Sequence, residues 1–218
     1  MIQWVYERSL QAASLAEVVV ATDDTRILDA VRKFGGRVTM TGSSHRSGTE
    51  RVAEVAARIE SDVFINVQGD EPLISPKTID AVCQPFAAVP ELLMSTARVE
   101  LFEAGEIETP HNVKVVTDRS GRALYFSRHP IPYVRGKSGR HFKHLGIYGY
   151  RRELLRDLEQ IPVSELEQSE QLEQLRFLDC GISIQVVTVE EDSVGVDTVE
   201  DLERVRPLLE NLTKYSLS

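Results

Sequence analysis

The chain has 218 residues, of which 42% are hydrophobic and 27% charged, a composition typical of a globular protein with one domain. This composition excludes fibrous and low-complexity proteins. Asp and Glu number 34 against 25 Lys and Arg, so the formal net charge of −9 disfavours general binding to nucleic acid or to anionic membranes. The sequence contains no apolar run of the roughly 18 residues that a membrane span needs and opens on an amphipathic helix, so we expect a cytoplasmic protein.

Helices and strands are expected to alternate along the first hundred residues, which is the pattern of right-handed βαβ units. A helix capped by Thr22 or Asp23 is expected to end at Gly35-Gly36, because glycine favours a helix end. The other helices of this half are expected over 1–13, 50–59 and 76–88, and the strands over 18–21, 37–40, 63–67 and 92–98.

The middle of the chain departs from this alternation. Two β-rich stretches, 113–117 and 123–127, flank a polar turn and predict a hairpin. The remaining elements are expected to be a loop over 128–141, a strand over 141–150, helices over 152–160 and 165–179, a strand over 182–189 and a helix over 198–211. The predicted fold is α/β, a Rossmann-like, mostly parallel sheet with helices on both faces and an antiparallel excursion over 113–150, within a single domain over 1–218.

The segment VFINVQGDEPLI, 63–74, leads an apolar strand into a polar run, where open α/β sheets have their sites. It leaves the carboxylate of Asp70 at the carboxyl end of the strand. Asp197 is placed similarly, just before the last helix. Each residue can also be an ordinary turn residue or helix cap. Two carboxylates at strand ends can, however, hold Mg²⁺ together, since this cation takes one or two carboxylates along with substrate phosphates.

Two hydroxyl residues, Ser47 and Thr49, lie with a glycine at the predicted start of a helix in HRSGTERV, 45–52. Hydroxyl and backbone N–H groups at a helix start suit an anionic or nucleotide ligand, although either residue is also a plain N-cap.

In KHLGIYGYR, 143–151, strand alternation places His144 and Tyr148 on one face as neighbours, which ordinary packing also explains. Glu173 and Gln174 lie on the flank of the predicted helix 165–179, by default a solvated face.

Taken together, six segments resemble, in order and approximate spacing, the family of 3-deoxy-manno-octulosonate cytidylyltransferases, or CMP-Kdo synthetases. The segments are HRSGTER, NVQGDEP, ALYFSR, KHLGIYGYR, LEQLR and GVDTVEDLERV. The resemblance extends from Met1 to about Pro207. It implies transfer of CMP from CTP to 3-deoxy-D-manno-octulosonate (Kdo), with release of pyrophosphate, for lipopolysaccharide core biosynthesis. It also implies a homodimer, for which the hairpin and the strand 141–150 are the candidate surface.

Carried over residue by residue, the resemblance implies a role for each matching side chain. Asp70 and Asp197 match the catalytic, magnesium-binding aspartates of the family, and Gln68 is similar to the residue between nucleotide and sugar. The nucleotide-recognition segment is matched by Ser47, Gly48, Thr49 and Arg51. The sugar-binding set is matched by His144, Tyr148, Glu173 and Gln174. The candidates for binding the sugar carboxylate are Arg128, Arg135 and Arg140.

The first residues depart from the family's pattern. Family members begin with a strand and a triphosphate-binding loop, and Met1-Ile2 matches the passage that follows them. The resemblance therefore implies that the sequence is incomplete at its N-terminus, and that neighbouring strand edges and apolar helix faces are uncovered.

Two other functions remain open at this point. One is a cytidylyltransferase for another sugar acid, such as sialic acid, or a uridylyl or guanylyl relative. The other is an inactive binding or dimerisation homologue, for which the missing loop is the argument.

Overall fold

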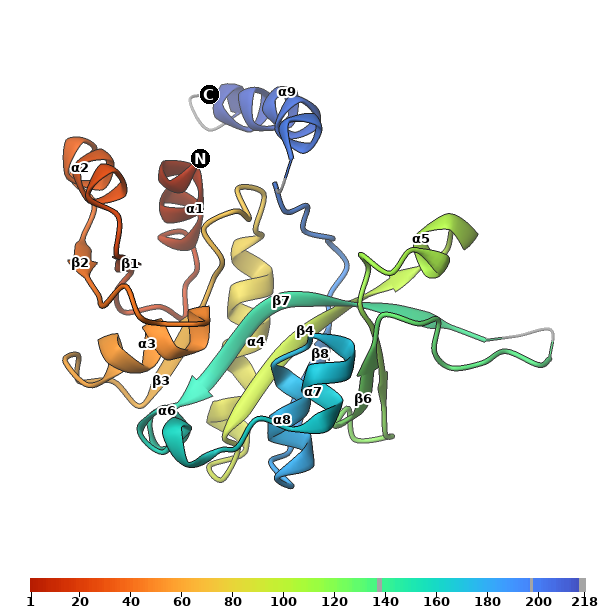
Figure 1. Ribbon diagram of the computed structural model, residues 1–218. Helices are drawn as coiled ribbons and strands as arrows, with labels where there is room; N and C mark the ends of the chain where they lie inside the picture. The colour runs from red at the N-terminus through yellow and green to blue at the C-terminus, as the bar shows by residue number, and fades with distance from the viewer. Residues whose placement is uncertain (137–138, 197, 216–218) are drawn as a thin grey trace.

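The computed structural model describes residues 1–136, 139–196 and 198–215 (Figure 1). Its helices are α1 (Ile2–Ser9), α2 (Thr25–Lys33), α3 (Gly48–Ala56), α4 (Pro76–Ala88), α5 (Ala104–Glu108), α6 (Arg152–Arg156), α7 (Glu165–Glu170), α8 (Gln174–Asp179) and α9 (Val199–Tyr215), with a 3₁₀ turn over Leu158–Gln160. Its strands are β1 (Val20–Thr22), β2 (Val38–Met40), β3 (Val63–Asn66), β4 (Met94–Leu101), β5 (Lys114–Thr117), β6 (Ala123–Ser127), β7 (His141–Arg151) and β8 (Ile184–Thr188).

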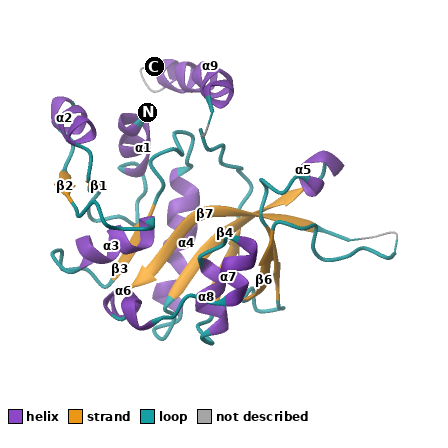
Figure 2. Cartoon of the chain, in the orientation of Figure 1, coloured by secondary structure: helices purple, strands orange, loops and turns teal. Residues whose placement is uncertain are grey.

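The larger sheet has the strand order β6-β5-β7-β4-β8, and β3 pairs with the far end of β7. The pairings make β3, β4, β5 and β8 run in one direction and β6 and β7 in the other. In Figure 2, α4 lies behind this sheet, and α7 and α8 lie in front of it. The expected fold class is therefore confirmed: the protein is α/β, with mostly parallel strands and an antiparallel excursion.

Two apolar clusters hold the helices against the larger sheet. One joins the strands to α6 and α8, with Met94, Phe126 and Phe177 fully buried. The other lies between α4 and the opposite face of the sheet and includes Ile79 and Val82. Because both faces of the central strands are covered, the ends of these strands are fixed firmly enough to carry a site.

Strands β1 and β2 form a separate, two-stranded parallel sheet. Within the described residues, β1 pairs only with β2 and β3 only with β7, so each has one unpaired edge. A groove of about 1020 Å³ lies between them, lined by many apolar side chains that include Val20, Val55 and Ile65. The expectation of unpaired strand edges is confirmed at this place; Val20 and Val55 themselves are buried.

Two helix boundaries differ from the sequence-based expectation. Helix α2 is capped by Asp24, whose side chain accepts a hydrogen bond from the Arg26 N–H, and not by Thr22 or Asp23. The expected helix 165–179 is two short helices, because Gln171 adopts the left-handed conformation with φ 55° and ends α7. This break redirects the chain just before Glu173.

No helix in the described ranges is long and apolar enough to cross a membrane.

Candidate active site

The N-terminus of α3 contains the first group of predicted ligand-binding residues. Ser47 is its N-cap, and the Ser47 side chain accepts a hydrogen bond from the Glu50 N–H. The first-turn N–H groups of the helix therefore point toward the loop before it, where the helix dipole favours an anion. Ser47 is thus the N-cap of α3 and also lies where the sequence predicts a ligand-binding residue.

A glutamate from a distant segment completes this group. Glu173 accepts hydrogen bonds from the hydroxyl of Ser47 at 2.7 Å and from that of Thr49 at 2.5 Å. The expectation that Glu173 lies on a solvated helix face is wrong, because the chain turns inward after Gln171. The carboxylate uses both oxygens to hold two hydroxyl groups of the loop in place.

Gly48 lies between these hydroxyl residues, close to the end of β3. A Cβ atom at Gly48 would lie 3.3 Å from Asn66 Nδ2 and 3.4 Å from Gln68 Nε2. A side chain at this position would therefore push away the polar residues at the strand end. Gly48 and Gln68, predicted from separate motifs, are neighbours in the structure.

Arg51, one turn further along α3, is anchored to the β1–β2 sheet. Its guanidinium group is 3.3 Å from the Asp23 carboxylate and donates to the hydroxyl of Thr41 at 2.5 Å. These contacts tie the nucleotide-recognition segment to the end of β1.

A row of aromatic rings continues from Thr49 along β7. The hydroxyl of Thr49 is 3.1 Å from that of Tyr150, whose ring stacks on Tyr148 with centroids 5.9 Å apart. The Tyr148 ring lies 5.3 Å from the His144 ring, so the predicted neighbourhood of His144 and Tyr148 is confirmed. Burial raises the pKa of Tyr148 and of Tyr150, and the nearby Glu173 carboxylate raises both further, so both stay neutral phenols.

His144 at the end of this row is buried and neutral. Desolvation, with a smaller contribution from the Lys143 charge, lowers its pKa to about 3. Its hydrogen bond to Thr96 and its edge-on contact with Phe126 orient the ring.

The buried state of His144 predicts a pH dependence of stability. In the unfolded chain a histidine takes up a proton near pH 6.5, whereas folded His144 does so only near pH 3. Above pH 6.5 His144 is neutral in both states, so stability does not depend on its protonation. Below pH 6.5 only the unfolded chain binds the proton, so the free energy of unfolding falls by up to about 1.4 kcal/mol per pH unit toward pH 3. Urea titrations between pH 7 and pH 5 are expected to show a shallower decline for His144→Gln than for the wild type; equal slopes would contradict this.

Asp70 lies in the turn after β3, and it does not cap the next helix, since α4 has Ser75 at its N-cap position. The backbone oxygen of Asp70 accepts a hydrogen bond of 2.9 Å from the Val196 N–H. Asp197, the other predicted metal ligand, lies outside the described residues. The cap of α9 is a neighbouring residue, Thr198, whose hydroxyl accepts from the Asp201 N–H. The residue just before Asp197 in the sequence, Val196, is thus hydrogen-bonded to the backbone of Asp70.

The surroundings of Asp70 are acidic. Glu71 is largely buried and accepts a hydrogen bond from the Ser193 hydroxyl. Desolvation raises the pKa of Glu71, and the charge of Asp70 adds to the effect. In the described part of the chain, no three His, Cys, Asp or Glu residues form a group fit for a metal ion.

Gln174 is buried, with 4% of its surface exposed, and its Nε2 has no hydrogen-bond partner among the described residues. An unpaired buried amide donor carries a free-energy penalty that an accepting ligand atom would remove. Gln174 follows directly after Glu173, which accepts the hydrogen bonds of the Ser47 and Thr49 hydroxyl groups.

The arginines proposed for the sugar carboxylate differ in their availability. Arg128 donates to the backbone oxygens of Glu170, Pro110 and Gln171, so it holds the hairpin to α7. Arg140 forms an exposed ion pair with Glu100. Within the described parts of the chain, none of the three arginines forms a hydrogen bond or ion pair with Ser47, Thr49 or Glu173, or with the aromatic row.

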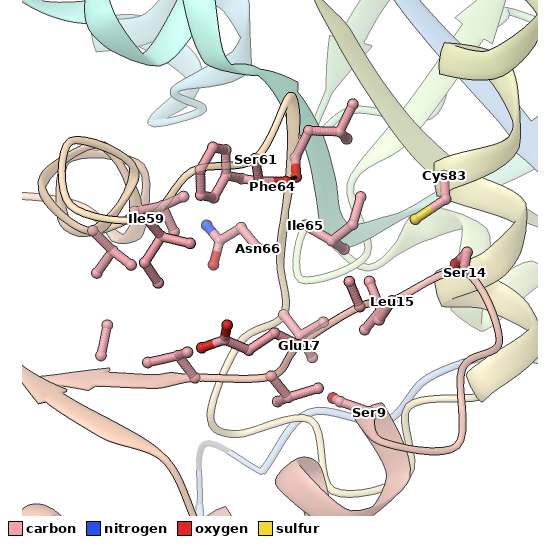
Figure 3. A pocket seen from close by; sticks show the side chains of 18 of the residues that line it. Ser9, Ser14, Leu15, Glu17, Ile59, Ser61, Phe64, Ile65, Asn66 and Cys83 are labelled. Carbon is pink, nitrogen blue, oxygen red and sulfur yellow. Dashed lines mark hydrogen bonds between the residues drawn. The ribbon is translucent and has the colours of Figure 1, made fainter.

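The large groove adjoins this site but extends beyond it. Gly48, Arg51 and Gln68 line its polar end. In Figure 3, Phe64 and Asn66 lie on one side of β3 and Ile65 on the other, and the segment with Leu15 and Glu17 lies across the open space from this strand.

Four residues that contact the site were not among those predicted from the sequence: Asp23, Asn66, Thr96 and Tyr150. Asp23 and Asn66 stand in the motifs TDD and NVQGDEP, and Tyr150 continues the alternation of β7, so these three had a local signal. Thr96 had none, because only the pairing of β4 with β7 brings it to His144.

The fold of the chain is shared with solved structures of low sequence identity. A solved structure of the inositol-1-phosphate CTP transferase from T. maritima superposes with a TM-score of 0.64 at 15% identity, over 96% of this chain and 81% of that one. This likeness shows that the two chains share a fold.

Closer comparisons show the family. The family described as Cytidylyltransferase matches residues 1–184. The 3-deoxy-manno-octulosonate cytidylyltransferase of Geotalea daltonii is 50% identical over 94% of this chain and 86% of its own length. That of Escherichia coli is 48% identical, over 96% and 85%. A solved structure of CMP:2-keto-3-deoxy-manno-octonic acid synthetase complexed with CTP superposes with a TM-score of 0.92 at 47% identity, over 96% and 87%. The chain belongs to the cytidylyltransferase family.

Proposed function

We propose that this chain transfers CMP from CTP to Kdo and releases pyrophosphate. The names of the relatives at about half identity support this reaction. The structural observation that carries it is the double hydrogen bond of Glu173 to Ser47 and Thr49. It joins the nucleotide-recognition segment to the segment proposed to bind the sugar, which are 126 positions apart in the sequence.

In the proposed reaction, a hydroxyl oxygen of Kdo attacks the α-phosphorus of CTP, and pyrophosphate leaves from the opposite side. The N-terminus of α3 favours the charge of the nucleotide. The amide of Gln68 lies beyond the end of β3 near Gly48, and its proposed place is between the nucleotide and the sugar. The protein then acts mainly by positioning two anionic substrates and by offsetting their charge.

Both substrates need several polar partners. Kdo is polyhydroxylated, and we propose that His144, Tyr148, Glu173 and Gln174 bind its hydroxyl groups. The unpaired Nε2 of Gln174 supports this role, since it is a buried donor ready for an acceptor.

The proposed cofactor is Mg²⁺, held by Asp70 and Asp197. The carboxylate oxygens of these residues suit this hard cation. The hydrogen bond from the Val196 N–H to the Asp70 backbone oxygen, which joins the motifs of both aspartates, supports the proposal. When bound, Mg²⁺ would lower the negative charge on the phosphates and so favour attack of the sugar hydroxyl on the α-phosphorus.

An assay of substrate specificity tests the function directly. Pyrophosphate release should require CTP rather than UTP or GTP, and Kdo rather than sialic acid. Equal turnover of sialic acid would replace this proposal by the broader sugar-acid cytidylyltransferase. No release with any pair, from protein shown to be folded, would favour an inactive binding homologue. We further propose, on the family resemblance, that the reaction serves lipopolysaccharide biosynthesis in the cytoplasm.

We also propose that the protein is a homodimer. The segment after β6 projects away from the rest of the molecule as an arm (Figure 1). Tyr133 on this arm is 88% exposed, and Phe102 at the end of β4 is 78% exposed. Exposed aromatic residues of this size are typical of interface centres.

Light scattering after gel filtration is expected to give about twice the chain mass of 24.5 kDa for the wild type. The double variant Phe102→Ser with Tyr133→Ser should give the monomer mass, because it removes both aromatic contacts. Leu166→Ser, on the exposed side of α7, is the control that should remain dimeric. A monomeric wild type would reject the proposal.

A further inference from the structure

The pairing between β4 and β7 contains an irregularity next to His144. Thr96 is paired with Tyr148, but its neighbour Ala97 is paired with Leu145. Gly146 and Ile147 therefore have no partner residue in β4, which makes a bulge in β7. Such bulges redirect side chains and leave backbone groups that need other partners.

The hydroxyl of Thr96 lies at this bulge, next to two backbone carbonyl groups of β7. Its Oγ1 lies 2.8 Å from the Ile147 carbonyl oxygen and 3.2 Å from that of Leu145. The same atom is 3.0 Å from His144 Nε2. Thr96 is fully buried, so its hydroxyl has no contact with bulk water.

The Thr96 hydroxyl has a single proton, and the direction in which it is donated determines the tautomer of His144. A threonine hydroxyl has one proton and can donate it once, while its lone pairs can accept. Carbonyl oxygens only accept, so the proton is best placed toward Ile147 or Leu145. Toward His144 the hydroxyl then acts as an acceptor, and Nε2 must be the nitrogen that carries hydrogen.

The other ring nitrogen is then a free acceptor. A neutral imidazole has one N–H, so Nδ1 has a lone pair, and burial keeps the ring neutral by lowering its pKa. Within the described residues, the hydrogen bond of the His144 ring is made by Nε2, and 9% of the residue's surface stays exposed. Tyr148 and Phe126 contact the ring on its sides and restrict its rotation.

We propose that Thr96 is a positioning residue that fixes His144 as the Nε2–H tautomer, so that Nδ1 accepts a hydrogen bond from a hydroxyl group of the sugar-acid substrate. The part about the sugar rests on the proposed function. The part about the tautomer does not, and it can be measured without substrate. In this proposal the bulge in β7 places the carbonyl oxygens of Leu145 and Ile147 next to the Thr96 hydroxyl, which then donates its proton to one of them and not to His144.

Two variants of Thr96 test the proposal. Thr96→Val keeps the shape of the side chain but removes the hydroxyl, whereas Thr96→Ser keeps the hydroxyl. Ser95→Ala is the matched control: Ser95 is the fully buried neighbour in β4, and its hydroxyl donates to the Val82 oxygen instead. All three are purified at full length and checked for folding by circular dichroism.

Imidazole ¹⁵N NMR of the protein without substrate should show the Nε2–H form in the wild type, Thr96→Ser and Ser95→Ala. Thr96→Val should show a mixture of tautomers. A wild-type His144 with hydrogen on Nδ1 would overturn the proposal, whatever the protein's reaction is.

Steady-state kinetics separate positioning from a merely structural effect. Thr96→Val should raise KM for Kdo about tenfold, the effect of one weakened hydrogen bond, and leave KM for CTP within about twofold. Thr96→Ser and Ser95→Ala should keep both constants. An unchanged KM for Kdo in Thr96→Val would overturn the role in substrate binding. Absence of Kdo turnover in the wild type, with the tautomer as proposed, would instead point to failure of the proposed function.

Discussion

Asp70→Asn is expected to lower kcat for pyrophosphate release about a thousandfold in the presence of saturating Mg²⁺. The amide keeps the shape of the side chain but removes the negative charge that attracts the cation, and a metal ion contributes several kcal/mol to phosphoryl transfer. The expected loss corresponds to about 4 kcal/mol of transition-state stabilisation.

The control for Asp70→Asn is Asp29→Asn, the same change on the exposed face of α2. It should keep full activity. Thermal unfolding of both variants should match the wild type, because neither residue belongs to the apolar clusters. Activity of Asp70→Asn within tenfold of the wild type would remove Asp70 from the metal site.

The second large effect concerns stability and lies away from the active site. Lys114 at the start of β5 is fully buried, and its ammonium group donates to the backbone oxygens of Thr109, Asn112 and Arg128 at 2.9, 2.6 and 2.5 Å. Lys114→Met is expected to lower the free energy of unfolding by about 3 kcal/mol, because it leaves three part-buried carbonyl groups without their donor.

Urea unfolding of Lys114→Met measures this effect. Lys77→Met is the matched control, since the Lys77 side chain is 89% exposed and its nearest carboxylate oxygen is 4.0 Å away. The control should change stability by less than about 0.5 kcal/mol. A change of that size in Lys114→Met as well would show that the three hydrogen bonds contribute little. The hairpin would then be held chiefly by its apolar contacts.

The local parts of the fold were predictable because their signals are local. The helix over Pro76–Ala88 begins with proline after serine and has apolar residues at helical spacing, and the structure has it at these bounds. The hairpin of β5 and β6 was indicated by two β-rich runs around a polar turn. The break after α7 was not predicted, since Gln171 is not a residue type that usually adopts a left-handed conformation.

The candidate site shows the same division. By themselves, the residues of the sequence determined which segments are polar at the ends of strands and helices, and hence that Ser47, Asp70 and His144 deserve testing. Only the tertiary structure decided which of these side chains meet. Glu173 contacts Ser47 because α7 ends early, and Thr96 contacts His144 because β7 bulges against β4. Periodicity and capping depend on neighbours within a few residues, whereas strand register and the direction of the chain after a break depend on packing of the whole domain.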